Sequence, residues 1–162
     1  MNWAMSFRAA ARARRLADRH YNRQSVGAAQ FVPPGRCLVL LTPEADAYWV
    51  TSWPFAEFVH HAWGGAWMCS AFRNEGSEHG STLIREAVAC TRTVFGEPPP
   101  LGMVTFVDPA KVRAKRDPGH VYVIAGFRPC GTTKGGLLAF QMTPERMPEP
   151  AEPLGFARRL FA

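Results

Sequence analysis

The stretch from Cys69 to Ala87, CSAFRNEGSEHGSTLIREA, joins two patterns of different period. It begins within the apolar run AWMCSAF (66–72), which is typical of a buried strand, and it ends within STLIREAVACTRTVF (81–95), whose apolar residues have helical spacing. A polar turn with Gly76 and Gly80 lies between them. A strand that enters a helix through such a turn indicates an α/β or α+β fold.

The other elements are predicted from short apolar runs bounded by Gly, Pro and Asp. We expect strands at 36–42, 47–54, 102–109 and 120–127, and an edge strand within 131–142. The first two should form a hairpin across Pro43–Asp46. This order predicts one α/β or α+β domain with a mixed sheet over residues 1–146, followed by a Pro-rich tail, 147–162, that is ordered only in part.

Composition narrows the class of protein. At 162 residues, with 47% hydrophobic and 20% charged residues, the chain is expected to fold as one globular domain, which excludes general disorder. The net charge of +6 favours polyanionic partners. Four cysteines without CxxC spacing and an arginine-rich start predict a cytoplasmic protein, and the sequence has no apolar run long enough for a membrane span.

The segment Ser6–Gln24 is rich in Ala and Arg and predicts a helix of about four turns. Five of its arginines recur at intervals of three or four residues, which would place them on one helical face: Arg8, Arg12, Arg15, Arg19 and Arg23. A solvated face and a contact with nucleic-acid phosphates both fit this stripe.

The polar turn is a candidate anion site, because the N-terminus of a helix presents free backbone N–H groups and partial positive charge. Gly76 and Gly80 would let the backbone approach a ligand, and Arg73 could bind a phosphate. The turn has neither the Walker nor the Rossmann glycine pattern. A plain turn before a helix capped by Ser81 or Thr82 is the other interpretation.

A succession of motifs carries a family resemblance: HYNR (20–23), AWMCSAFRNEG (66–76), GSTLIREA (80–87), GMVTFVDPAKVR (102–113) and DPGHVYVIAGFRPCGTT (117–133). Over about residues 17–140 the chain resembles the Mom-type DNA-modification proteins of bacteriophages, which are divergent members of the GNAT-like acetyltransferase superfamily. The resemblance implies a twisted mixed sheet flanked by helices and opened between its two central strands, where the pantetheine arm of an acyl-CoA would insert.

The same resemblance implies a cofactor loop between the central strand and the helix. Its expected cofactor-binding residues are Arg73, Asn74, Glu75, Gly76, Gly80 and Ser81. Arg73 and Gly76 fit the family pattern [RQ]xxGx[GA] for pyrophosphate binding, whereas Glu78 stands where the pattern has Gly or Ala. The implied donor is acetyl-CoA or another acyl or aminoacyl donor, and a metal-assisted step stays open.

The implied function is modification of adenine N6 in double-stranded phage DNA with a carbamoylmethyl group, in the cytoplasm of the host, which shields the DNA from restriction. His20 and Tyr21 match the family's HY pair, and Asp108 matches an acidic position. His20 would act as base or metal ligand, Tyr21 as proton donor or stacking ring, and Asp108 as the partner of His20 or a metal ligand. A surface histidine and an Asp-Pro turn are the simpler interpretations.

Two further catalytic candidates follow. Ser81 would hold a reacting oxygen or cap the helix, and Tyr122 stands near the place of a general-acid tyrosine in this fold, although tyrosines in strands usually only pack.

Other residues suggest contacts with DNA or a metal. A basic segment follows Asp108 and is expected to bind phosphates together with the arginine stripe: Lys111, Arg113, Lys115 and Arg116. Four tryptophans are candidates for base stacking or, for most of them, for core packing: Trp49, Trp53, Trp63 and Trp67. The five histidines lack metal-ligand spacing, so surface positions are favoured for them.

Two other classes of function stay open. One is a GNAT-type N-acyltransferase that uses acetyl-CoA on a small amine or a protein. The other is a non-catalytic protein that binds nucleic acid through its basic surface.

Overall fold

A seven-stranded mixed sheet organises the chain in the computed structural model, which describes residues 1–54, 59–112 and 117–157. The strands are β1 (Ala4–Met5), β2 (Arg36–Leu41), β3 (Ala47–Trp53), β4 (Trp67–Asn74), β5 (Met103–Val107), β6 (Arg128–Thr132) and β7 (Leu138–Met142). The helices are α1 (Ala11–Asp18), α2 (Gly80–Phe95), α3 (His120–Ala125) and the 3₁₀ turn η2 (Pro144–Arg146). The predicted mixed α+β class is confirmed.

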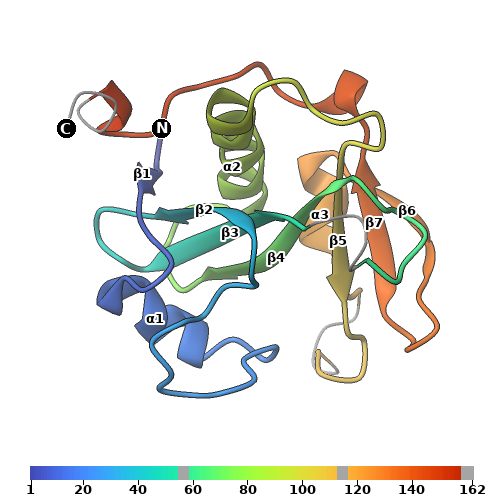
Figure 1. The fold of residues 1–162 in the computed structure, drawn as a ribbon, viewed down its shortest axis with the longest axis horizontal. Helices are drawn as coiled ribbons and strands as arrows, with labels where there is room; N and C mark the ends of the chain where they lie inside the picture. The colour runs from blue at the N-terminus through green and yellow to red at the C-terminus, as the bar shows by residue number, and fades with distance from the viewer. Residues whose placement is uncertain (55–58, 113–116, 158–162) are drawn as a thin grey trace.

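The strand order is β1-β2-β3-β4-β5-β7-β6, and all neighbours are antiparallel except the parallel pair β4 and β5. Parallel neighbours need a crossover connection, and α2 lies within it. In Figure 1, α2 and α1 lie on opposite sides of the sheet, and β5 to β7 run nearly at right angles to β2 and β3. The sheet therefore has two arms that meet at β4 and β5.

Each side of the sheet has its own buried cluster. Beneath α2 and α3, Trp3, Trp49 and Trp67 are fully buried among apolar side chains, and on the other side Leu16 of α1 packs near Val39 and Val50. Alternating residues of β2 thus serve opposite faces, with Leu38 and Leu40 on one side and Val39 and Leu41 on the other.

A chain of hydroxyls crosses the core between β3 and α2. Thr91 donates to the carbonyl of Ala87 at 2.8 Å and lies 2.8 Å from the Thr51 hydroxyl, which accepts from the Trp49 indole at 2.6 Å. Because the Thr91 proton is used on Ala87, Thr51 donates to Thr91. The polar atoms of three buried side chains are thereby satisfied.

Several predicted boundaries are wrong. The N-terminal helix covers Ala11–Asp18 rather than 6–24, so Arg12 and Arg15 are helical, Arg8 precedes the helix, Arg19 is at its C-cap and Arg23 lies beyond it. The single arginine stripe therefore does not exist.

The segment 120–127 is not a strand: its first six residues form α3, which begins after Gly119 and ends before Gly126. Both glycines have positive φ, +83° and +112°, and the ring of Phe140 leaves no room for a Cβ at Gly119. The segment 131–142, predicted as one edge strand, instead contains the end of β6, which is the edge strand, and all of β7, which is internal because it pairs with β5 on one side and β6 on the other.

The tail, as far as Ala157, packs along α2. The backbone N–H of Ala151 donates to the carbonyl of Ala89 at 3.2 Å, Arg92 donates to the carbonyl of Pro148 at 2.6 Å, and Leu154 forms a bridge with β1. Figure 1 shows this segment passing over α2 toward the N-terminus. Of the described helices, none has the length and apolarity needed to cross a membrane.

Candidate functional site

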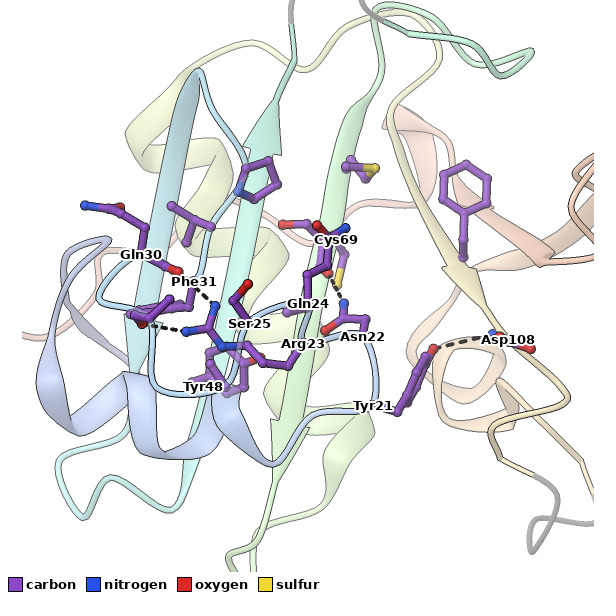
Figure 2. A pocket seen from close by; sticks show the side chains of 18 of the residues that line it. Tyr21, Asn22, Arg23, Gln24, Ser25, Gln30, Phe31, Tyr48, Cys69 and Asp108 are labelled. Atoms are coloured by element: carbon purple, nitrogen blue, oxygen red, sulfur yellow. Dashed lines mark hydrogen bonds between the residues drawn. The ribbon is translucent and has the colours of Figure 1, made fainter.

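The candidate site is a cavity where β4 and β5 separate. These strands pair only at Trp67–Met103, Met68–Val104 and Cys69–Thr105, and β4 then continues for five residues away from β5. A cavity of about 850 Å³ lies beside this gap, on the α1 side of the sheet. Its walls come from the segment 21–34, from 68–71 of β4 and from the end of β5 (Figure 2).

Two neighbouring side chains from the segment after α1 connect the two sides of the gap. The backbone N–H of Asp108, just after β5, donates to the Tyr21 hydroxyl at 3.4 Å, and the Asn22 amide donates to the carbonyl of Ser70 in β4 at 2.8 Å. Figure 2 shows Tyr21 reaching toward Asp108 while Asn22 points to β4. The structure thus brings Tyr21 and Asp108 together, two of the five predicted catalytic residues.

His20 stacks on Tyr21 and is not one of the residues that line the cavity. The two rings stack with centroids 4.7 Å apart, and His20 Nδ1 accepts from the backbone N–H of Asn22 at 3.2 Å. Burial lowers the pKa of His20, so its imidazole is neutral at pH 7. Asp108 contacts Tyr21 through its backbone, and its Oδ1 accepts from the N–H of Ala110 at 2.9 Å, so it also forms the predicted Asp-Pro turn.

Tyr122 stands on α3, not on a strand, and its hydroxyl lies 3.9 Å from the Sγ of Cys69. Both groups are buried, and burial raises the pKa of Tyr122 well above its ordinary value and that of Cys69 to about 12. Both are therefore protonated at neutral pH. Cys69 lines the cavity, whereas Tyr122 lies behind it and is not part of the wall.

The predicted cofactor loop is held by bonds within itself and to Arg19 at the C-cap of α1. Arg19 donates two bonds of 2.7 Å to the carboxylate of Glu75, and Arg73 donates one of 2.6 Å to the same group. These bonds hold the pKa of Glu75 at about 2. The predicted phosphate ligand Arg73 is therefore paired with a carboxylate of its own loop.

The remaining loop residues are also engaged. Asn74 accepts from the N–H of Gly76 at 2.9 Å and donates to the carbonyl of Glu78 at 2.7 Å. The carboxylate of Asp46 lies where a Cβ at Gly76 would stand, so a side chain there would collide with the β2–β3 turn. Glycine at this position is explained by close packing, and its predicted role in binding a cofactor stays a prediction.

The start of α2 differs from the prediction. The N-cap is His79, and no side chain in the described part of the chain caps the helix, so a capping role for Ser81 or Thr82 is wrong. Gly80 packs close to Val121 of α3, where an added Cβ would lie 3.0 Å from a methyl carbon. Ser81 is in the first turn of α2, outside the cavity wall.

The predicted DNA-binding arginines have internal partners in four cases. Arg8 donates to the carbonyl of Gly35 and Arg12 to that of Pro43, at 2.7 and 2.6 Å, and Arg19 is paired with Glu75 as described. The side chain of Arg23 is only 9% exposed. Arg15 is exposed on α1.

Arg23 organises the cavity wall. It bonds to Asp18 at 2.8 Å and to the carbonyls of Ala28 and Gln30 at 2.6 and 2.8 Å, while Asp18 also accepts from the N–H of Gly27 at 3.0 Å. Figure 2 shows the guanidinium turned toward Gln30 and Phe31. A structural role is therefore visible for this residue, besides its predicted contact with DNA.

Of the basic segment after Asp108, Lys111 is exposed and lines the cavity. Arg113, Lys115 and Arg116 lie outside the described residues. Trp49 and Trp67 are fully buried and Trp53 packs on the core, which confirms core packing for three of the four tryptophans. Within residues 1–54, 59–112 and 117–157, no three His, Cys, Asp or Glu side chains gather as a potential metal site.

Sequence reasoning missed the roles of Asn22, Ser70 and Phe106. Asn22 is part of the HYNR motif and Phe106 of the run that ends at Asp108, but only the tertiary contacts give them a common cavity. The chain matches no known family model, no curated protein and no solved structure.

Proposed function

We propose that this protein is a DNA-modifying transferase that attaches a carbamoylmethyl-type group to adenine N6 and so protects phage DNA from restriction. The observation that carries the proposal is the meeting of Tyr21 and Asp108 at the gap between β4 and β5, beside a cavity of about 850 Å³. Ligand sites of small molecules typically measure roughly 300–1,000 Å³. A nucleobase and part of a donor would fit such a volume.

The side chains at the gap suit a transfer to an amine. Adenine N6 is a weak nucleophile, so transfer needs a group that accepts its proton and close positioning of the donor. The Asp108 carboxylate supplies the acceptor. Burial raises the pKa of Tyr21, so its phenol keeps its proton at pH 7 and can donate it to the leaving group. As the bond from N6 to the donor carbon forms, the bond from that carbon to the leaving group breaks.

The target adenine has to reach the cavity from within a DNA duplex. This amine lies at the major-groove edge of a base pair, so reaction in the cavity requires the base to be flipped out of the duplex. Phe31, Tyr48 and Phe106 give the cavity aromatic walls, and Lys111 gives it an exposed cation. The net charge of +6 favours the approach of a polyanion.

The deciding experiment is mass spectrometry of nucleosides from plasmid DNA that has been co-expressed with the protein. We expect a new adenosine-derived mass with the wild type, and its loss with Asp108→Ala, Tyr21→Phe and His20→Ala. Glu44→Ala, at an exposed position in the β2–β3 turn, is the matched acidic control and should keep the product. Unmodified nucleosides from cells that contain folded wild-type protein would count against the proposal.

An N-acyltransferase acting on a small amine is the second candidate. Its support is the edge of β4 beyond Cys69, which is not paired with β5 and would suit the amides of an extended acyl-CoA arm. To bind the pyrophosphate with Arg73, such a donor would have to displace Glu75. Turnover of acetyl-CoA with an amine and without DNA would favour this function. DNA binding without any covalent product would instead favour a non-catalytic protein.

A further inference from the structure

Three aromatic rings form a cluster at the β5 side of the cavity. Phe106 of β5 lies with its ring centroid 5.0 Å from that of His61 and 5.8 Å from that of Trp63, and the last two are 5.9 Å apart. All three side chains are half-buried. We call this group the aromatic cluster.

The aromatic cluster is continuous with the cavity, because Phe106 belongs to both. Its outer side reaches β6, where a Cβ at Gly131 would lie 3.9 Å from Cη2 of Trp63. A base that leaves the cavity at the β5 side would therefore meet aromatic rings first.

Neither buried core of the described chain includes this cluster. Trp63 and Phe106 are absent from both sets of core residues and from the apolar residues packed against them, whereas Trp3, Trp49 and Trp67 are fully buried. Among the described residues, Trp63 and Phe106 therefore contribute to neither of the two buried cores. Aromatic rings that are only half-buried beside a cavity are typical of stacking sites for bases.

The charges nearby also suit a nucleic-acid strand. Burial lowers the pKa of His61, whose Nδ1 accepts from the backbone N–H of Trp63 at 3.1 Å, so the imidazole is neutral at pH 7 and presents an uncharged face. Lys111 stands exposed on the cavity wall and can meet a phosphate. Rings for bases and a cation for the backbone are the usual components of a single-strand site.

We propose that the aromatic cluster binds, by stacking on Trp63, the base next to the flipped adenine in the DNA strand. This inference rests on the proposed function and adds a second base site to it. The occupant is a deoxyribonucleotide base in a locally unpaired strand, and Trp63 is a positioning residue that holds the strand while the target adenine is in the cavity.

The test is a binding cycle with short single-stranded oligodeoxynucleotides that contain one adenine. Affinity is measured by fluorescence anisotropy at fixed salt. The intact oligonucleotide is compared with two others, in which an abasic site replaces the base on one side of the adenine or on the other. Because stacking of a base on an aromatic ring contributes substantially to the binding free energy, Trp63→Ala should weaken binding about tenfold. Trp63→Phe should retain most of the affinity, and Phe7→Ala, at an aromatic side chain 59% exposed elsewhere, should leave it unchanged.

Stacking predicts a specific pattern. The abasic site that weakens wild-type binding should cause no further loss in Trp63→Ala, because the variant already lacks the contact. Equal affinity of wild type and Trp63→Ala, or independent losses from the variant and the abasic site, would overturn the inference, as would tighter binding of the matching RNA. Should modified adenosine still form while Trp63→Ala binds normally, only this inference fails. Absence of both wild-type binding and modified adenosine would remove the proposed function as well.

Discussion

Replacement of Arg23 by alanine separates a structural role from a phosphate contact. The Arg23 side chain is 9% exposed and donates to the carbonyls of Ala28 and Gln30 at 2.6 and 2.8 Å. These bonds fold the segment that lines the cavity. Arg23→Ala should therefore destabilise the protein and loosen this segment, whether or not DNA is present.

The magnitude follows from the two carbonyl bonds. Hydrogen bonds from a charged donor contribute roughly 1.5–3 kcal/mol each, and the lower value applies where water can reach the freed carbonyls. We therefore expect a loss of about 3 kcal/mol in the free energy of unfolding. For a chain of this size each kcal/mol lowers Tm by about 2–4 °C, which gives a decrease of about 6–12 °C.

Thermal unfolding followed by circular dichroism measures the decrease, and hydrogen exchange locates it. The amide of Gly27, which donates to Asp18 at 3.0 Å, should lose protection in the variant. Arg12→Ala is the matched control: its guanidinium is exposed and bonds to the carbonyl of Pro43, so Tm should change little. Wild-type Tm and protection in Arg23→Ala, together with weaker DNA binding and a smaller salt slope, would refute the structural role.

Three further predictions concern other parts of the chain. Two guanidinium groups hold the pKa of Glu75 at about 2, below its ordinary value of 4.5. The ionised carboxylate therefore stabilises the fold fully above pH 4.5, and this stabilisation disappears as the pH falls from about 4.5 toward 2. The Tm difference between wild type and Glu75→Gln should vanish over that range, and a constant difference would contradict the ion pairs. Thr51→Val leaves the buried Trp49 indole N–H without its acceptor and should cost about 1–3 kcal/mol in urea unfolding, whereas an unchanged midpoint would show that the hydroxyl chain is dispensable. The thiol of Cys69 is buried and has a pKa of about 12, so at pH 8 it should react with a thiol reagent far more slowly than the half-buried Cys37. Equal rates would show that the cavity wall around Cys69 opens to the reagent.

The central unit of the fold was predictable from local patterns. The runs that become β2, β3, β4 and β5 were located to within about two residues, because apolar runs between turn residues are a local signal, and the helix after the polar turn was found for the same reason. Tyr21 and Asp108, which the structure brings together, had both been predicted as site residues through a resemblance rather than through spacing.

The errors arose where tertiary packing overrode local preference. Val121, Val123 and Ile124 favour a strand, yet they form a helix, because Gly119 fits beneath Phe140 with a positive φ and the helix buries Tyr122 and Ala125 against the core. The Ala- and Arg-rich composition of residues 6–24 likewise suggested one long helix, but the bonds of Arg23 to carbonyls of the following loop stabilise a different path.

The sequence alone determined the class of fold, the strand–turn–helix unit and the basic character of the chain, since these depend on hydrophobic periodicity and charge along the chain. Only the tertiary structure decided that Tyr21 meets Asp108, 87 residues away, that Arg19 is paired with Glu75, and that Trp63 lies outside the two described cores. These features depend on where β4 and β5 separate and on which segment covers the gap. Contacts between residues distant in the chain are set by the packing of whole elements, and no local pattern encodes them.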